Sequence, residues 1–519
     1  MVQADASAEE KAPRYAYYAL LLLLLANFLN YIDRSVISIV AEHVKMDLEL
    51  TDTQLGFLMG TAFAVFYGVA GIAMGRISDA LSRTKLMAVA LVIWSGLTAV
   101  SGAATSFAQL AAARIGVGLG ESACSPCSQA LLAEYFPARN RGTAISIYLL
   151  GTYVGGAVSL LLGALVLQNW PDACGYFPGN ACELEDWRAA FLAVGLPGLI
   201  LAVFVYRLRE PPRLRPYDPA PVPHIVVREM SAAIPPLTLF NLANAGGRQA
   251  VMRNFVLIAV LTVIGGALTF LTGDLAQWAA VGVGAYSILT WGQVMKLRDR
   301  PLFALTFGSP TFASMILGGA LCACMSAAIG SWSAPFAMRE LGASPVTAGF
   351  YVGIAGSLGA VFSVPLGGWL ADKWGQYDVR APIWIALIGM LASIPFIVWM
   401  VMAPDLQTFA VATMLHSFFG NAWGGANAKL SQDLVMPRMR GAASACFTLC
   451  MTVTSAGFGP YTAGKVSQLT GSLSTGLLSI LVVAPFAAAL FVYAAAKRKA
   501  ETPERLIRRA REAGEPIPA

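Results

Sequence analysis

The stretch that decides the fold reads Asn30-Tyr31-Ile32-Asp33-Arg34, and it lies inside an apolar run from about residue 16 to residue 40. A run of this length is enough for one α-helix to cross a bilayer. A charged side chain at that depth costs about 3 kcal/mol, so such residues usually line a pathway or pair with one another. Because Asp33 and Arg34 are adjacent, they point about 100° apart on a helix. Each therefore needs a partner on another helix.

A second apolar run, 108–132, offers those partners because it contains Arg114 and Glu121 in the sequence R-I-G-V-G-L-G-E. These two residues are two helical turns apart and share one face. The glycines between them allow another helix to approach closely. We expect Asp33, Arg34, Arg114 and Glu121 to form one buried polar cluster. The alternative is a static set of ion pairs that only holds helices together, although four ionisable groups at membrane depth exceed what packing requires.

The composition places the chain among polytopic membrane proteins. Of its 519 residues 57% are hydrophobic and 12% are charged, which excludes the soluble globular classes. The net charge of +6 is explained by membrane topology and predicts no nucleic-acid partner. No small-residue cleavage site follows the first apolar run, so we expect that run to remain as a membrane helix.

Apolar runs predict fourteen membrane spans, grouped as six, two and six. We therefore expect an all-α fold made of two six-helix bundles with an extra two-helix hairpin between them. The hairpin either crosses the membrane or lies at its interface. The expected units are a first bundle in 1–206, a basic, proline-rich linker in 207–253, the hairpin in 254–300, a second bundle in 301–496 and a tail in 497–519.

The distribution of charges in the connections predicts the orientation. Lysine and arginine fall on one side of the predicted spans, and the connections on the other side carry acidic residues. By the positive-inside rule, both termini are cytoplasmic, which requires an even number of spans. We expect a multi-pass protein of the cell membrane, of bacterial inner-membrane type.

An internal repeat relates the two bundles. The pattern G-x-x-x-D follows the second span of each half, at Gly75–Asp79 and at Gly368–Asp372. P-x-R-x-R-G in the first half is echoed by P-R-x-R-G in the second, and glycines recur in the fifth and eleventh spans. Three echoes in the same order indicate duplicated six-helix units.

Two cysteines, Cys174 and Cys182, flank a polar loop that should face outward. The sequence is compatible there with either a disulfide or two free thiols.

Motifs for ATP binding or catalysis are weaker. Residues 459–466 resemble a phosphate-binding loop but lack its closing Ser or Thr, so no ATP site is expected. The chain has three histidines and no motif with the residue spacing of a hydrolase or a metal site, so we expect no enzymatic activity, no metal and no cofactor. If the protein were an enzyme, a membrane enzyme that modifies lipids would be the alternative.

The G-x-x-x-D loops, R-x-G-x-G-x-G-E and the glycine-rich fifth span resemble the major facilitator superfamily across nearly the whole chain. N-Y-I-D-R-S, G-R-I-S-D-A-L-S-R and E-Y-F-P-A-R-N-R-G are similar to the spinster family of lipid transporters, particularly its bacterial members. This resemblance implies a twelve-helix core, alternating access, and proton-linked movement of lysophospholipids or sphingosine 1-phosphate. An organic-anion branch of the superfamily shares N-Y-x-D-R, so proton symport of small organic anions or sugar acids stays open.

The resemblance also implies roles for individual residues. Asp33 and Glu121 are the expected proton-binding pair, because a buried carboxylate and a nearby arginine form a balance that substrate entry can tip. Arg34 and Arg114 are expected to bind the anionic substrate, together with Tyr31 and Asn30. Apart from the resemblance, His416 and Asn421 are polar residues of the tenth span, which either help to bind substrate in the cavity or pack against a neighbouring helix. Gating is assigned to the two G-x-x-x-D loops, with topological charge alone as the alternative; the residues are Gly75, Asp79, Arg83, Gly368, Asp372, Lys373 and Gly375.

The loops depart from the fuller superfamily pattern, because Ala80 replaces a basic residue and Gln376 replaces an arginine. Gating contacts could therefore be weaker, or borrowed from Arg76 and Lys85.

The spans of the second half are nearly free of charge and contain many aromatic residues. They either form an apolar wall of the cavity, suited to a lipid tail, or face the bilayer. We expect an amphipathic lipid or organic anion, protons and membrane lipids as partners of a monomer. The aromatic residues are Trp332, Phe336, Phe350, Phe362, Phe418, Phe419 and Phe447.

Overall fold

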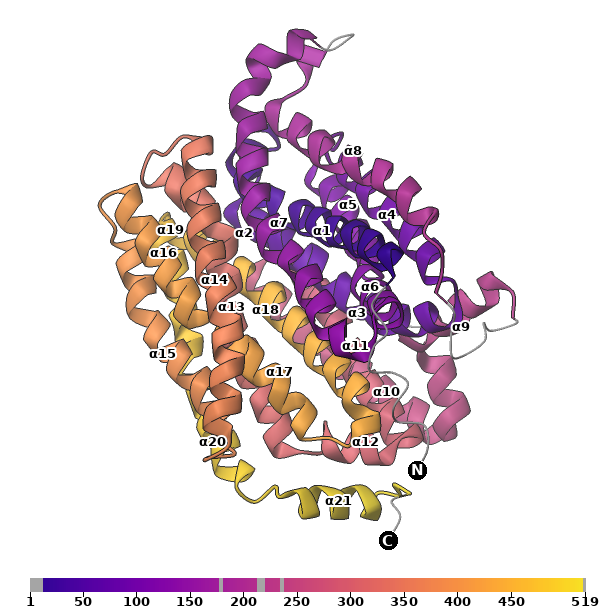
Figure 1. Cartoon of the computed structure of the whole chain (residues 1–519). Helices are drawn as coiled ribbons and strands as arrows, with labels where there is room; N and C mark the ends of the chain where they lie inside the picture. The colour runs from indigo at the N-terminus through magenta and orange to yellow at the C-terminus, as the bar shows by residue number, and fades with distance from the viewer. Residues whose placement is uncertain (1–12, 177–180, 212–219, 234–237, 517–519) are drawn as a thin grey trace.

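The structure is a computed structural model that describes residues 13–176, 181–211, 220–233 and 238–516 (Figure 1). Within these residues every regular element is helical, and none is a strand. A helix satisfies its own backbone hydrogen bonds, which a chain surrounded by lipid requires. The prediction of an all-α polytopic membrane protein is confirmed.

The first six-helix bundle, here the first half, follows the predicted spans. Its second span starts as α2 and continues through a short π-helical turn, η1, into α3, and its fourth span is divided into α5 and α6. The helices are α1 (Arg14–Asp47), α2 (Asp52–Gly56), η1 (Phe57–Thr61), α3 (Ala62–Ala80), α4 (Arg83–Ser101), α5 (Phe107–Glu121), α6 (Cys124–Tyr135), α7 (Ala138–Ala173) and α8 (Asp186–Tyr206).

The second bundle, the second half, repeats this order, with its fourth span divided in the same way. A short amphipathic helix, α21, follows it and lies across one end of the bundle (Figure 1). The helices are α13 (Pro310–Arg339), α14 (Pro345–Gly375), α15 (Ala381–Val401), α16 (Leu406–Gly420), α17 (Trp423–Asp433), α18 (Arg440–Thr470), α19 (Leu473–Ser479), α20 (Val483–Arg498) and α21 (Pro503–Glu512).

Between the halves lie α9 (Val222–Ala233), α10 (Thr238–Thr272), α11 (Leu275–Arg298) and α12 (Arg300–Leu305). Part of the predicted linker is thus helical: α9 packs on α3, and α10 begins before a bend at Gly247, where φ is 62°. Helices α10 and α11 form the predicted hairpin. Linker positions 212–219 and 234–237 lie outside the described residues.

Within the described residues, eleven helices are long and apolar enough to cross a membrane. Three predicted spans are not among them. One is α11, and the other two are the divided fourth spans, which break after Glu121 in the first half and after Gly420 in the second. A break at the same place in both halves agrees with the internal repeat. Divided helices are common beside the binding sites of transporters.

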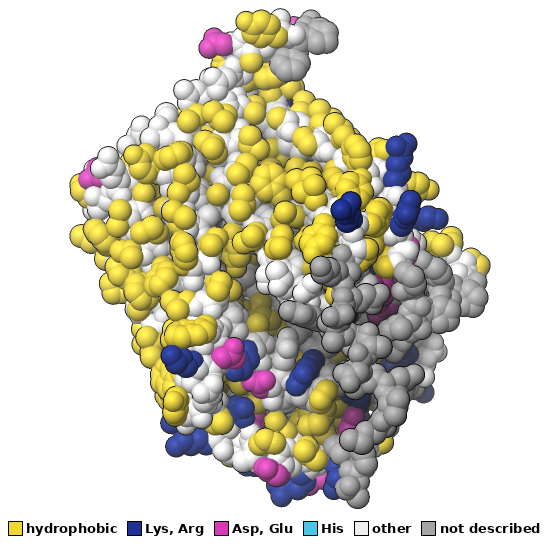
Figure 2. Space-filling model, viewed as in Figure 1, with side chains coloured by type: hydrophobic (Ala, Val, Ile, Leu, Met, Phe, Trp, Pro, Cys, Tyr) yellow, Lys and Arg dark blue, Asp and Glu magenta, His cyan; other side chains and the backbone are white. Residues whose placement is uncertain are grey.

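The two ends of the molecule differ. We call the end where α1 begins and α20 ends the terminal face, and the opposite end the distal face. On the side shown in Figure 2, hydrophobic side chains cover the middle and upper part, and charged side chains are spread over the lower part, with a further group of Lys and Arg at the upper right. A buried cluster that includes Val36, Leu160 and Val352 joins the halves.

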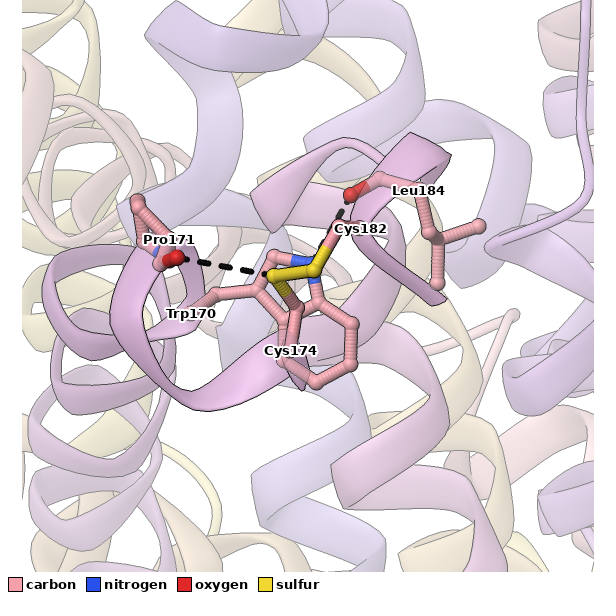
Figure 3. The surroundings of a disulfide bond; sticks show 5 residues. All are labelled: Trp170, Pro171, Cys174, Cys182 and Leu184. Carbon is pink, nitrogen blue, oxygen red and sulfur yellow. Dashed lines mark hydrogen bonds between the residues drawn. A yellow bond between two sulfur atoms is a disulfide. The ribbon is translucent and has the colours of Figure 1, made fainter. Parts of the chain in front are cut away.

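A disulfide links Cys174 to Cys182 beyond the distal end of α7 (Figure 3). The indole N–H of Trp170 donates to the carbonyl of Leu184 across the same loop, at 2.8 Å. The open question of these two thiols is thereby answered in favour of a bond.

Candidate functional site: a buried charge cluster behind a cavity

The four charged residues predicted to meet do lie together. Arg34 Nε on α1 donates to Glu121 Oε2 at the end of α5, at 2.7 Å. Arg114 Nη1 on α5 donates to the backbone carbonyl of Asp33, at 2.9 Å. Arg114 and Glu121 are buried, and Arg34 is only partly exposed. The α1–α5 contact therefore depends on charge-assisted hydrogen bonds, which are stronger than neutral ones.

The Asp33 carboxylate differs from the prediction. We expected a charged partner for it on another helix, but within the described part of the chain no arginine or lysine pairs with either carboxylate oxygen. The Thr98 hydroxyl on α4 is the polar group of another helix that neighbours this carboxylate. The physical reason is that Arg114 binds the backbone of Asp33 and not its side chain, a choice that residue spacing does not reveal.

Aromatic rings hold Arg34 in place. Its guanidinium carbon lies 4.2 Å from the ring centre of Tyr67, 4.6 Å from that of Phe63 and 4.9 Å from that of Tyr31. Cation–π contacts of this kind are worth about 0.5–2 kcal/mol each, more when water is excluded. Phe63 and Tyr67 of α3 were not predicted. Their four-residue spacing in an apolar run is the signal that could have suggested them.

A cavity of about 450 Å³ lies between the two halves. Four of the six predicted substrate-binding residues line it: Tyr31 and Arg34 from α1, and His416 and Asn421 from α16 and the break after it. Asn30 and Arg114, together with Asp33 and Glu121, are buried behind this wall. Arg34 is thus shared: its side chain lines the cavity and also binds Glu121.

Eight serine and threonine hydroxyls line the rest of the cavity wall beside aliphatic side chains such as Met59, Leu160 and Val352. None of the seven aromatic residues considered for an apolar wall is among the described residues that line the cavity. Trp332 and Phe336 are buried inside the second half, whereas Phe350 and Phe362 are exposed on its surface. Of the two alternatives, the exposed Phe350 and Phe362 agree with the one in which these residues face the bilayer, and small side chains of the second half line the cavity. The lining hydroxyl residues are Ser35, Ser38, Ser326, Ser331, Ser333, Ser357, Thr413 and Ser417.

His416 supplies the aromatic nitrogen on the second-half wall. It is 2% exposed, and within the described residues its Nδ1 has no hydrogen-bond partner. Asn421 donates to the carbonyl of Ser417 at 2.8 Å, which leaves its amide oxygen to face other groups. The two residues lie opposite Arg34, so one ligand can contact both walls.

The distal face contains an ion-pair network that sequence reasoning missed. Arg339 of α13 contacts Asp52 at 2.8 Å and Glu42 at 2.7 Å. Lys45 Nζ lies 2.6 Å from Asp52, and Ser467 of α18 donates to the same carboxylate at 2.7 Å. The network thus joins α1 and α2 of the first half to α13 and α18 of the second.

Backbone packing between the halves is tighter near the distal face than near the terminal face. A Cβ atom on Gly56 would lie 2.4 Å from the carbonyl oxygen of Pro460, and one on Gly60 would lie 2.1 Å from that of Ala456. These contacts join α2 and η1 to α18 in the distal part of the molecule. Nearer the terminal face, Gly71 and Gly75 of α3 have no described atom within 4 Å of such a Cβ. The α2–α3 side of the seam is closed distally and looser towards the terminal face.

The predicted gating residues make contacts inside each half. Arg83 pairs with Asp79 at 3.2 Å and with Glu134 of α6. In the second half Asp372 pairs with Lys429 of α17. Lys373 does not pair with Asp372 but lies over the ring of Trp369, at 4.9 Å. These pairs do not join the halves in this conformation.

Glycines of the loops are open. Among the described atoms, nothing lies within 4 Å of a Cβ built on Gly75 or Gly368, and Gly375 has Lys429 Nζ at 3.8 Å. Arg76, which was considered as a substitute for the basic residue missing from the first loop, lies 3.8 Å from Glu229 of α9.

Comparison with known proteins agrees with this architecture. The model of the Major Facilitator Superfamily matches residues 23–336 and 315–517. An MFS-type efflux pump of Mycolicibacterium smegmatis is 26% identical over 92% of this chain and 91% of its own length. A probable L-galactonate transporter of Escherichia coli is 30% identical over 37% of this chain and 40% of its own length.

Among solved structures, the crystal structure of a bacterial homologue of the human lysosomal transporter spinster, inward-facing and unoccupied, has a TM-score of 0.71. It is 25% identical, and the match covers 95% of this chain and 100% of that one. The resemblance to the spinster family is thereby supported by sequence and by fold. The family model covers nearly the entire sequence, and the chain belongs to the major facilitator superfamily.

Proposed function

We propose that this transporter is proton-coupled and moves a compact, hydroxylated organic anion by alternating access between its halves. The observation that carries the proposal is the cavity, in which Arg34 lies on one wall, His416 and Asn421 lie on the other, and eight serine and threonine hydroxyls are distributed among aliphatic side chains. A cavity of about 450 Å³ lies in the usual range for small-molecule sites.

Substrate recognition depends on Arg34. Its planar guanidinium suits a carboxylate or phosphate, which it binds through parallel hydrogen bonds. Serine and threonine hydroxyls both donate and accept, so they match the hydroxyl groups of a sugar acid. His416 and Asn421 then orient the far end of the molecule. The L-galactonate transporter among the relatives supports this substrate class.

Coupling follows from the shared position of Arg34. In this conformation the Arg34 guanidinium binds Glu121. A substrate anion in the cavity would compete with Glu121 for this guanidinium. When Arg34 turns to the substrate, Glu121 loses a hydrogen-bond donor in a buried site. A buried carboxylate without a donor is costly in its charged form, so proton uptake accompanies substrate binding. Asp33, which has no arginine or lysine partner among the described residues, is the second proton carrier.

The energy available is sufficient for useful transport. One proton that moves through 100 mV supplies about 2.3 kcal/mol. That amount corresponds to a roughly fiftyfold concentration gradient of substrate.

Alternating access requires that the distal network open while the terminal ends of the halves close. In the conformation described here, the ion pairs of Arg339 close the distal face. The lysine and arginine bias of the connections favours a cytoplasmic terminal face, in a bacterial inner membrane. The G-x-x-x-D loops then act in the other conformation, in which their halves approach each other.

An amphipathic lipid is the second candidate substrate. The similarity to the spinster homologue covers 95% of this chain, whereas the match to the L-galactonate transporter covers 37%. The same Arg34 would bind a lipid phosphate. A lipid tail, however, would meet serine and threonine hydroxyls among the aliphatic side chains of the cavity wall.

Uptake into proteoliposomes tests these proposals. With an inward proton gradient, we expect saturable accumulation of labelled galactonate or glucuronate that collapses when a protonophore is added. Gradient-driven movement of a labelled lysophospholipid, without movement of either sugar acid, would favour the lipid. Movement of neither class would reject the assignment of Arg34 as the anion site, and chemical alteration of the substrate without a gradient would indicate an enzyme.

A further inference from the structure

The hairpin of α10 and α11 is an addition to the two halves. Helix α10 packs chiefly against α11 and α9. In the most apolar part of its span, none of the residues is buried within the protein, although the mean hydropathy there is 2.4. The bilayer therefore surrounds α10 wherever α11 does not.

The two hairpin helices are bonded to each other near both ends. Towards the terminal face, the Tyr286 hydroxyl donates to Asn254 Oδ1 at 2.6 Å, and Asn254 Nδ2 donates to Thr290 at 3.0 Å. At the distal turn, the Trp278 indole donates to the Thr272 hydroxyl at 2.8 Å. These contacts fix the helices at two levels.

Between the two levels the helices part around a groove of about 590 Å³. Its floor has three glycines. A Cβ built on Gly266 or Gly282 would have no described atom within 4 Å, and one on Gly265 would have the carbonyl of Trp278 at 3.8 Å. No charged side chain is among the described residues that line the groove. The space is apolar and is left open by missing side chains.

We propose that this groove is a binding site for one acyl chain of a bilayer phospholipid. Water is a poor occupant, because the lining offers it few polar partners. An empty groove would forfeit dispersion contacts along both helices. Because α10 is otherwise uncovered, the groove opens directly to the hydrocarbon phase, where acyl chains are the abundant apolar molecules.

The position of the groove gives the bound chain a consequence. The opposite side of α11 contacts both halves: Gln277 donates to the carbonyl of Gly457 on α18 at 2.7 Å and accepts from Thr61 on the first half at 2.6 Å. Gly284 of α11 also lies between Val65 and Val453. An acyl chain in the groove would pack on the α10-facing side of α11, opposite the side that contacts both halves.

Photocrosslinking tests the site. The full chain is reconstituted in vesicles of phosphatidylethanolamine and phosphatidylglycerol that contain a phosphatidylethanolamine with a diazirine in the middle of one acyl chain. After illumination, mass spectrometry locates the labelled peptides. We expect labelling concentrated on residues 258–286, and severalfold lower labelling there in Gly266→Leu, whose side chain fills the groove. Gly96→Leu is the matched control, because Gly96 on α4 is equally open among the described atoms.

A second variant and a second readout separate loss of the site from loss of folding. Gly282→Leu fills the groove from the opposite helix and should lower labelling as Gly266→Leu does. Returning phospholipid to delipidated protein should raise the melting temperature of wild type and Gly96→Leu more than that of either groove variant. Equal labelling of α4 and α10, unchanged labelling in both groove variants, or crosslinks between two copies through α10 would each overturn the proposal.

Discussion

Arg339, at the end of α13, donates its two terminal nitrogens to the carboxylate of Asp52, at the start of α2, at 2.8 and 3.0 Å. The pair joins the two halves directly at the distal face. A bidentate pair of this kind is among the stronger polar contacts in proteins. The closed end of this transporter is therefore held by residues far from both G-x-x-x-D loops.

Replacing Arg339 with Gln should favour opening of the distal face. The substitution removes charge-assisted hydrogen bonds worth about 1.5–3 kcal/mol each and leaves Asp52 with Lys45 and Ser467. In a background without accessible thiols, a cysteine at Ser331 in the cavity wall should react faster with a maleimide added from the distal side. Arg380→Gln is the control, because Arg380 pairs with Asp378 inside one loop. Equal labelling rates in wild type and Arg339→Gln would contradict the role of the pair.

Replacing Glu121 with Gln should uncouple transport from protons. Gln keeps an oxygen that can accept from Arg34 Nε, so the cluster can still form, but it carries no titratable proton. We expect loss of concentrative uptake with substrate counterflow retained, and the same pattern for Asp33→Asn. Uptake with and without a proton gradient in proteoliposomes measures this. Glu512→Gln, on exposed α21, is the control, and gradient-driven accumulation in both site variants would reject the coupling role.

Replacing Tyr67 with Leu should weaken anion binding without removing any charge. The Tyr67 ring has the shortest of the guanidinium–ring distances at Arg34, and its loss leaves the side chain less well positioned. A loss of about 1–2 kcal/mol corresponds to a roughly five- to thirtyfold higher Kd for the anion. Titration calorimetry in detergent measures the change. Tyr206→Leu, on the exposed surface of α8, should bind as wild type does, and equal Kd values for the two variants would exclude a role for the ring.

The sequence predicted the helices and the charge cluster because both depend on local rules. Arg114 and Glu121 had to share a face, and charges at membrane depth had to meet. The cavity wall was not predictable in this way. Which face of a second-half helix turns inward depends on packing between helices, so Trp332 was buried and Ser333, the next residue, lines the cavity. Arg339 was missed because a charge at a span end has several uses, and only the packed halves show which one applies.

The terminal face offers a prediction about pH. The Arg438 guanidinium, which lies 2.9 Å from Asp299 between α11 and α12, lowers the pKa of that carboxyl below its usual value. A lowered folded-state pKa adds stability above the unfolded pKa of about 3.9 and loses it as the pH falls through the folded value. Asp299→Asn keeps a side-chain oxygen to cap α12 at Leu302 but removes the charge. The melting temperature of the variant should therefore fall below that of wild type at neutral pH, and the difference should shrink as the pH drops below about 4.

Asp405→Asn is the control. Asp405 caps the start of α16 at the distal face, and its pKa is lowered by hydrogen bonds from Thr408 and not by an arginine. High salt should reduce the effect of Asp299→Asn more than that of Asp405→Asn, and a difference for Asp299→Asn that persists unchanged in acid would show that Arg438 does not stabilise the charged carboxylate.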